Sequence, residues 1–267
     1  MNKEEFINNL KELNIEITDK KLNQLDLYYQ ILKEENNKYN LTAITEEKQV
    51  YLKHFFDSLT ITKIIKLNSQ SLCDIGTGAG FPGIVLKIIY PDLSVTLLES
   101  NKKKCNFLNI IKEKLNLTKL TIINKRAEDY SKEHREIYDI VTSRAVAPLK
   151  HLLEYSVPLV KVNGYYIAMK SNIEKETKNI NNYYQKLDIN LVDKIEFTLP
   201  IENSKRTLLL YQKTKKTNKI YPRKYNEITK KEIYLNAARD NFDKADNYNQ
   251  RLDDLTKELQ LAMKWGV

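Results

Sequence analysis

Residues 1–67 carry apolar side chains at helical spacing. Leu22, Leu25, Tyr28 and Leu32 follow one another three or four positions apart, as on one face of a helix. The same stretch contains neither glycine nor proline, the two residues that most often interrupt helices. The pattern predicts an all-helical N-terminal segment.

After residue 67 the period of the pattern changes. Short apolar or β-branched runs alternate with helical stretches of roughly 10 to 15 residues, as parallel strands joined by right-handed helical crossovers require. The runs are SLCDI (71–75), SVTLLE (94–99), KLTIIN (119–124), YDIVTS (138–143) and GYYIAMK (164–170). They predict a doubly wound, mostly parallel α/β sheet with helices on both faces.

Two further apolar runs, LVDKIEFTL (191–199) and KRTLLLYQK (205–213), have no convincing helix between them. They could form an antiparallel pair at one edge, which brings the expected sheet to seven strands. Beyond Lys213 the chain turns polar, and its end has the pattern of a charged, mostly helical tail. The predicted organisation is a helical segment (1–67) packed on a core domain (68–213), a basic segment (214–234) and the tail (235–267).

Composition limits the class of protein. A chain of 267 residues with 42% hydrophobic content can bury one sizeable core. The start lacks the apolar region of a signal peptide, and no window approaches about 18 consecutive apolar residues, so we expect a soluble cytoplasmic protein. Cys73 and Cys105 lie in an expected strand and an expected helix without a CxxC motif, which indicates neither a disulfide framework nor a metal site.

The net charge of +9 and the isoelectric point near 9.2 favour an anionic partner such as nucleic acid. Only seven of the 44 basic residues are arginine, however, and asparagine and isoleucine are abundant. A strongly AT-biased coding sequence would produce that composition without selection for binding. The positions of the arginines are therefore more informative than the total charge.

The glycine-rich stretch DIGTGAGFPG (74–83) follows the first expected strand and holds four of the six glycines. Its second half satisfies GxGxxG, the dinucleotide-binding pattern, whereas Asp74 to Gly80 satisfy the D-x-G-x-G-x-G pattern of S-adenosylmethionine-dependent methyltransferases. The strand's apolar run reaches Ile75, so the tight turn begins at Gly76, which the dinucleotide interpretation leaves unexplained. Asp74, at the end of the strand, can offer its carboxylate to a cationic or amino-bearing ligand.

Two more carboxylates follow the next two strands. Glu99 ends the second strand, where it can accept hydrogen bonds from ribose hydroxyls in either nucleotide interpretation. Glu128, in RAED (126–129), lies where an adenine amino group could be recognised, with a surface loop charge as the alternative.

The loop after the fourth strand reads YDIVTSRAVAPL (138–149). It has neither the Asn/Asp-Pro-Pro-Tyr/Phe motif of adenine amino methyltransferases nor the cysteine nucleophile of cytosine C5 enzymes. Arg144 occupies the position instead, with Ser143 beside it. A planar, permanently charged guanidinium suits contact with an anionic or aromatic partner, and a surface salt bridge is the alternative.

Motifs along most of the chain together resemble those of one family, the small-subunit ribosomal RNA guanine-N7 methyltransferases, also called glucose-inhibited division protein B. The combination of DIGTGAGFPG with SRAVA is specific to that family. The resemblance runs from about residue 5 to residue 233, so residues 235–267 fall outside it. The motifs are YNLT (39–42), HFFDS (54–58), DIGTGAGFPGI (74–84), TLLES (96–100), RAED (126–129), YDIVTSRAVAPL (138–149), AMK (168–170), KRTLLL (205–210) and YPRK (221–224).

The resemblance implies the Rossmann-like fold of class I S-adenosylmethionine-dependent methyltransferases. It also implies methyl transfer from S-adenosylmethionine to N7 of a guanine in 16S ribosomal RNA, in a hairpin loop of the decoding region. Gly76, Phe81 and Arg144 would contact the donor, with Ala127 and Glu128 near its adenine. To these the residue patterns add Asp74, Gly78 and Glu99 as donor-binding candidates, with Arg144 and Ser143 as the catalytic candidates.

Guanine N7 carries a lone pair and no proton, so the implied reaction needs alignment rather than a general base. Phosphate-contact candidates are Lys170, Arg206, Arg223 and Lys224, with Tyr221 as a possible stacking surface. His54 and Asp57, three residues apart on an expected helix, could also face the site, although a structural role suits His54 better.

The implied partner is 16S ribosomal RNA or an assembly intermediate of the small subunit, without a membrane or an obligate protein partner. The chain departs from the family where AMKSN lacks the usual glycine after Lys170 and where the segment after YPRK lacks glycine and proline. The alternatives are an NAD-dependent oxidoreductase and a non-catalytic nucleotide- or RNA-binding module.

Overall fold

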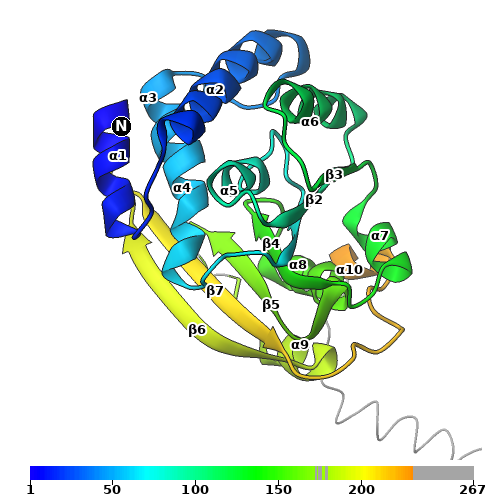
Figure 1. The fold of residues 1–267 in the computed structure, drawn as a ribbon. Coiled ribbons are helices and arrows are strands. Elements are labelled where there is room, and N and C mark those ends of the chain that lie inside the picture. The colour runs from blue at the N-terminus through cyan, green and yellow to red at the C-terminus, as the bar shows by residue number, and fades with distance from the viewer. Residues whose placement is uncertain (172, 174–175, 178–179, 231–267) are drawn as a thin grey trace, which may run out of the picture. The chain divides into compact units, whose positions relative to one another are not determined.

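The structure is a computed structural model that describes residues 1–171, 173, 176–177 and 180–230 (Figure 1). The predicted tail, residues 235–267, lies outside the described residues. Within the described part of the chain, every helix is too short or too polar to cross a membrane.

The N-terminal residues form the predicted helices, joined by short loops. The chain passes through α1 (Lys3–Glu12), α2 (Asp19–Tyr39), α3 (Glu47–Val50), η1 (Tyr51–Phe56), α4 (Asp57–Leu59) and η2 (Thr60–Lys63). Asn2 begins α1 with a capping box: its side chain accepts from the Glu5 amide, and the Glu5 carboxylate accepts from the Asn2 amide. The Thr18 hydroxyl caps α2 by accepting from the Lys21 amide.

The predicted sheet is confirmed, with seven strands in the order β3-β2-β1-β4-β5-β7-β6. The central pairs are parallel, whereas β7 runs antiparallel to both β5 and β6, as the sequence suggested for the edge. The order reverses between β1 and β4, so the carboxyl ends of these two strands border the crevice where such sheets bind ligands. The strands are β1 (Ser71–Ile75), β2 (Ser94–Leu98), β3 (Leu120–Ile123), β4 (Tyr138–Arg144), β5 (Val160–Lys170), β6 (Ile189–Thr198) and β7 (Lys205–Lys213).

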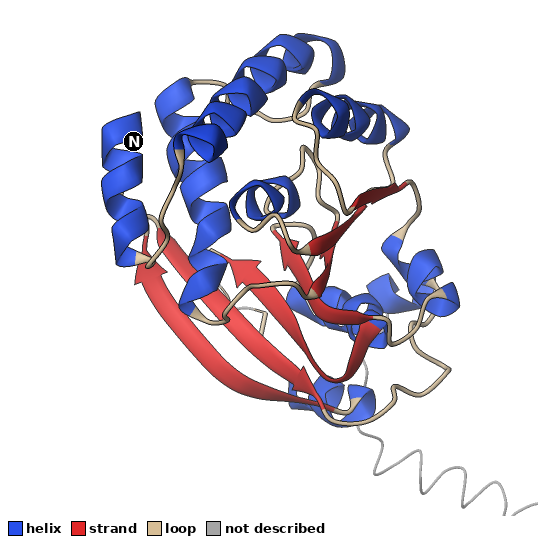
Figure 2. Cartoon of the chain, viewed as in Figure 1, coloured by secondary structure: helices blue, strands red, loops and turns tan. Residues whose placement is uncertain are grey.

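Helices cover both faces of the sheet (Figure 2). One layer contains α5 and α6, which pack against the N-terminal α2. The other contains α7, α9 and α10, which pack around α8. These crossover and C-terminal elements are α5 (Gly83–Ile89), α6 (Lys102–Lys114), α7 (Ala127–Glu133), α8 (Leu149–Ser156), η3 (Val157–Leu159), α9 (Ile180–Leu187) and α10 (Tyr225–Lys230).

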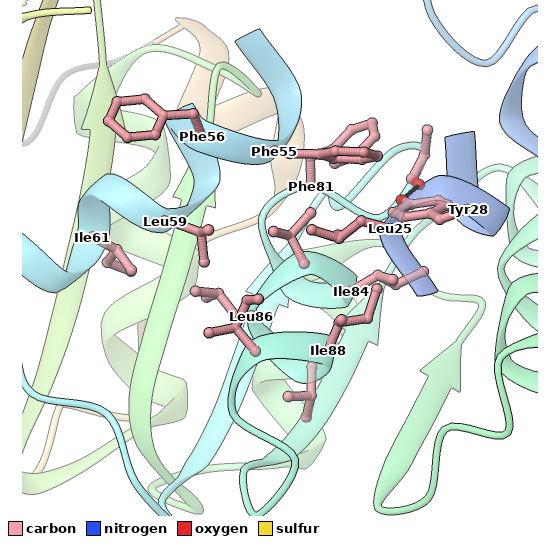
Figure 3. Close-up of a cluster of buried hydrophobic side chains, with 14 of the residues drawn as sticks. Leu25, Tyr28, Phe55, Phe56, Leu59, Ile61, Phe81, Ile84, Leu86 and Ile88 are labelled. Atoms are coloured by element: carbon pink, nitrogen blue, oxygen red, sulfur yellow. Dashed lines mark hydrogen bonds between the residues drawn. The ribbon is translucent and has the colours of Figure 1, made fainter. Parts of the chain in front are cut away.

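A buried hydrophobic cluster joins the N-terminal helices to α5 (Figure 3). Burial of such side chains stabilises a fold by about 1.5–3 kcal/mol each, so the N-terminal segment is held firmly against the sheet domain. This packing brings η1 and α4 beside the loop that follows β1. The labelled side chains are Leu25, Tyr28, Phe55, Phe56, Leu59, Ile61, Phe81, Ile84, Leu86 and Ile88.

Tyr28 ties α2 directly to the glycine loop. Its ring is fully buried, and its centroid lies 5.6 Å from that of Phe55 and 5.5 Å from that of Phe81. Its hydroxyl donates a hydrogen bond to the Ala79 carbonyl. The N-terminal segment therefore supports the loop through a polar contact as well as through apolar packing.

Replacing Tyr28 with phenylalanine should lower the free energy of unfolding by about 1–3 kcal/mol, because the Ala79 carbonyl would lose a buried donor. Urea denaturation measures this loss. Tyr29→Phe is the matched control, since the Tyr29 hydroxyl makes a longer, exposed bond of 3.3 Å to the Thr45 carbonyl. Equal stability of the two variants would contradict a supporting role for the Tyr28 hydroxyl.

Candidate functional site

The loop after β1 turns sharply at Gly76, as the sequence predicts. Gly76 has φ +64° and Gly78 has φ +62°, values in the left-handed region that favours glycine. The Gly76 amide donates to the Leu98 carbonyl at 2.8 Å, and the Gly78 amide donates to the Glu99 carboxylate at 3.0 Å. Both glycines therefore line the crevice with their backbone.

Asp74 fixes the loop from beneath. The residue is fully buried, and its Oδ2 accepts from the Thr77 hydroxyl at 2.6 Å and from the Gly83 amide at 2.8 Å. It lines neither of the two cavities that adjoin Gly76. The structure therefore uses this carboxylate to hold the loop, whereas the sequence suggested that it faces the ligand.

The burial of Asp74 has a consequence for the pH dependence of stability. Burial raises the pKa of its carboxyl to about 7, against the lowering effect of hydrogen bonds from Thr77 and Gly83 and of the charge on Arg144. The unfolded chain has the ordinary value of about 3.9. The native state thus keeps a proton that the unfolded state releases, and the free energy of unfolding falls as the pH rises from about 4 to about 7.

Asp74→Asn should flatten this part of the pH profile, because the amide does not ionise. Urea denaturation of parent and variant at a series of pH values between about 4 and 8 measures the difference in slope. The comparison of slopes is independent of any constant loss of stability in the variant. Identical slopes would show that Asp74 titrates in the native state as it does in the unfolded chain.

Glu99 also supports the loop. Besides accepting from the Gly78 amide, it accepts from the Asn101 amide at 2.7 Å, where α6 begins. It is buried and lines neither cavity. Its predicted contact with a ribose stays a prediction.

Two cavities adjoin Gly76. The larger, of about 400 Å³, is bounded by the glycine loop, by η1 and α4, and by the ends of β4, β5 and β7. The smaller, of about 210 Å³, also borders Gly76 and lies beside the start of α7. Among the predicted residues, Gly76, Gly78, Phe81, Arg144, Lys170 and Arg206 line the larger cavity, and Gly76, Ala127 and Glu128 line the smaller.

The Val146 side chain packs on Gly76. A Cβ built on Gly76 would lie 2.5 Å from Val146 Cγ1, which is closer than non-bonded carbon atoms lie in proteins. Val146 lines the smaller cavity and follows Arg144 in the loop after β4. The loops after β1 and β4 therefore meet at Gly76.

Arg144, the last residue of β4, makes a network with the N-terminal segment. Its Nη1 donates to the Lys53 carbonyl at 2.8 Å and lies 3.2 Å from Asp57 Oδ2, while its Nη2 lies 3.3 Å from His54 Nδ1. The guanidinium also lies over the Phe81 ring, 5.4 Å from its centroid. The fork geometry of arginine allows all these contacts at once.

Asp57 joins two arginines across the larger cavity. Its Oδ2 pairs with Arg144, and its Oδ1 accepts from Arg206 Nε at 2.9 Å. Asp57 is 4% exposed, so the carboxylate is screened little by water and neutralises part of the charge of both guanidiniums. This residue of α4 thus links β4 to β7.

His54 stays neutral in this network. Burial, then the charge of Arg144, lowers the pKa of its imidazole to about 3. Because Arg144 donates toward Nδ1, the proton of the neutral ring belongs on Nε2, which lies 2.9 Å from the Thr42 hydroxyl. The ring stacks on Phe81 with centroids 4.3 Å apart. These contacts fit the structural role that the sequence suggested for His54.

Ser143 lies away from the cavities, contrary to its prediction as a catalytic candidate. It is fully buried, and its hydroxyl lies 2.7 Å from the Tyr166 hydroxyl. Successive side chains of a strand point to opposite faces, so a residue adjacent to Arg144 faces the other side of β4.

The predicted phosphate contacts fall into different environments. Lys170 lines the larger cavity, and its ammonium group is 2.8 Å from Glu176. Arg223 makes a two-pronged pair with Glu154, at 2.7 and 2.8 Å, while Lys224 is exposed. Tyr221 is buried, so its ring does not offer the stacking surface suggested by the sequence.

Sequence reasoning missed most of the lining of the smaller cavity, including Val146 and Tyr225. Val146 belongs to the SRAVA motif, and Tyr225, at the start of α10, follows directly after YPRK. Neither of these two side chains carries a charge, so neither stands out in the sequence as chemically active.

Residues 21–208 match the protein family described as rRNA small subunit methyltransferase G. The chain is 49% identical over 218 residues to the ribosomal RNA small subunit methyltransferase G of Mycoplasma capricolum, covering 81% of this chain and 94% of that protein. It is 46% identical over 228 residues to the protein of the same name from Bacillus cereus strain ZK, covering 84% and 95%. A solved structure of M. jannaschii TYW2 in complex with AdoMet has a TM-score of 0.48 and 15% identity, covering 63% of this chain and 77% of that chain.

Proposed function

The chain belongs to the rRNA small subunit methyltransferase G family, and on that premise we propose that it transfers a methyl group from S-adenosylmethionine to N7 of a guanine in 16S ribosomal RNA. The observation that carries the proposal is the pair of cavities that adjoin Gly76, with Arg144 on the wall of the larger one. The glycine turn follows the first strand at the point where the strand order reverses.

The residues at this turn suit the donor. Glu128 lines the smaller cavity and is buried, and its Oε1 accepts no hydrogen bond from the described residues, so an adenine amino group would supply a missing donor. Gly78, where a Cβ would meet only the Gly76 carbonyl oxygen at 3.9 Å, leaves room for the rest of the donor beside the larger cavity. When bound, S-adenosylmethionine supplies an electrophilic methyl group.

The larger cavity suits an acceptor that needs orientation rather than deprotonation. His54 is neutral, and both of its ring nitrogens already have hydrogen-bond partners, so it is not a free base. N7 of guanine offers a lone pair without a proton, so alignment of the base is the main requirement. Arg144 and Phe81 present a cation and an aromatic ring on the wall of this cavity.

Asp57 explains how a cation can border a base that becomes positively charged. Methylation at N7 moves positive charge onto the guanine, which an isolated arginine would oppose. The carboxylate of Asp57 lies 3.2 Å from Arg144 and 2.9 Å from Arg206, so the three side chains together carry a single positive charge. Arg206, at the same wall, is suited to a phosphate of the RNA.

Deletion of the gene, followed by mapping of N7-methylguanine in the small-subunit RNA, tests the proposal. We expect one modified guanine in the decoding region to disappear and to return when the parent gene is supplied. Retention of that modification in the deletion strain would contradict the proposal. Calorimetry with S-adenosylhomocysteine and NAD checks the donor separately, and tight binding of NAD alone would support an oxidoreductase instead.

A further inference from the structure

We propose that Tyr225 is a donor-binding residue that closes the smaller cavity around the adenine of the donor. This inference rests on the proposed function. The residues before Tyr225 were expected from the sequence to contact RNA, whereas the cavity that Tyr225 lines points to a different ligand. Tyr225 lies beyond residues 21–208, which match the family.

The segment that carries Tyr225 is anchored to the sheet domain. Arg135 donates from Nη1 to the Tyr221 carbonyl and from Nη2 to the Thr217 carbonyl, both at 2.7 Å. Arg223 pairs with the fully buried carboxylate of Glu154 on α8. Such charge-assisted, two-pronged contacts fix position as well as providing energy. Tyr225 is therefore presented from a defined backbone.

The side chain of Tyr225 lines the smaller cavity and is 50% exposed. The guanidinium of Arg126 lies over its ring, 5.5 Å from the centroid. Leu98, Ala147 and Tyr155 provide further apolar lining. A half-exposed ring at the border of a cavity is available to cover a flat aromatic ligand, and burial of the ring would be favourable.

Glu128 in the same cavity indicates which flat ligand fits. Its Oε1 is buried and accepts no hydrogen bond from the described residues, and the nearest cation, Arg126, is 3.9 Å away. An unpaired buried acceptor is costly, so a ligand with an exposed N–H donor is favoured. Adenine combines an amino group with an aromatic face, and the cavity provides a partner for each.

Calorimetry on Tyr225→Ala and Tyr225→Phe tests this inference. S-adenosylhomocysteine and 5′-methylthioadenosine, which lacks the amino-acid end, are the two probes. We expect Tyr225→Ala to weaken both probes about tenfold or more, because one aromatic contact with a base is lost. Tyr225→Phe should bind both like the parent, since the ring is retained. Ile220→Ala is the control, because Ile220 is an exposed apolar residue of the same segment that lines neither cavity.

Each other outcome of this experiment has a separate meaning. Parental affinity of Tyr225→Ala for both probes would overturn the inference. A loss for S-adenosylhomocysteine alone would also overturn it, because the adenine would then not be the contacted part. If the parent protein itself bound neither probe, the proposed function would fail first. Circular dichroism during heating checks that each variant is folded.

Discussion

Gly76→Val should abolish the binding of S-adenosylhomocysteine and, with it, methyl transfer. At φ +64° a β-branched residue is strained by about 1–2 kcal/mol, and its Cβ would lie 2.5 Å from Val146 Cγ1. Relief of the overlap requires either the turn or Val146 to move, and both line the smaller cavity, which is proposed to hold the adenine of the donor. Calorimetry should show affinity reduced about a hundredfold or more, which corresponds to roughly 3 kcal/mol.

A comparison of Gly76→Ala with Gly78→Ala separates steric overlap from backbone strain. Gly78 has nearly the same φ, but a Cβ there would meet only the Gly76 carbonyl oxygen at 3.9 Å, an ordinary contact. We expect Gly78→Ala to retain much more donor affinity than Gly76→Ala. Urea denaturation shows whether each variant is folded. Equal losses in two folded variants would mean that strain alone, rather than closeness to Val146, explains the effect.

The sheet was predictable because its signals are local. Each strand is a short apolar run bounded by polar residues, and β1 and β7 have the bounds expected from the sequence. The strand β5 begins at Val160 rather than at Gly164, since polar residues such as Asn163 hide the start of the apolar run. The hydrophobic pattern of the sequence thus predicts the existence of a strand more reliably than it predicts where that strand begins or ends.

The site was only partly predictable because its contacts join distant segments. The glycine loop is one continuous stretch, so its role followed from spacing. By contrast, Asp57 accepts a hydrogen bond from Arg206, which lies 149 positions later in the sequence. Only the packing of the N-terminal helices on α5 brings these two residues together. The prediction that Ser143 lies in the site was wrong because Ser143 and Arg144 are neighbours in one strand. Neighbouring side chains of a strand point to opposite faces of the sheet.

The N-terminal segment is therefore part of the site as well as of the core. Tyr28 holds the Ala79 carbonyl, while His54 stacks on Phe81. Asp57 and the Lys53 carbonyl hold the guanidinium of Arg144. A methyltransferase sheet alone would leave Arg144 without these partners. The helical segment thus fixes the residue that we expect to orient the acceptor.

Arg144→Ala should lower the rate of methyl transfer about a hundredfold or more while changing donor affinity much less. In the proposed reaction the guanidinium orients the acceptor, and small misplacements of reacting groups have effects of this size. Arg144→Lys should recover little, because an ammonium group does not reach the Lys53 carbonyl, Asp57 and His54 together. Single-turnover rates with saturating donor, set beside calorimetric affinities for S-adenosylhomocysteine, separate the two effects.

The matched control for this prediction is Lys132→Ala, which removes one positive charge from the exposed side of α7. Lys132 lines neither cavity. It should leave the single-turnover rate unchanged. If Arg144 has only a structural role, Arg144→Ala would lose stability in urea while its folded fraction kept the parental rate. A stable variant with parental rate would remove Arg144 from the reaction. If the guanidinium of Arg144 aligns the acceptor, the variant should transfer methyl slowly while it keeps the parental donor affinity and an intact fold.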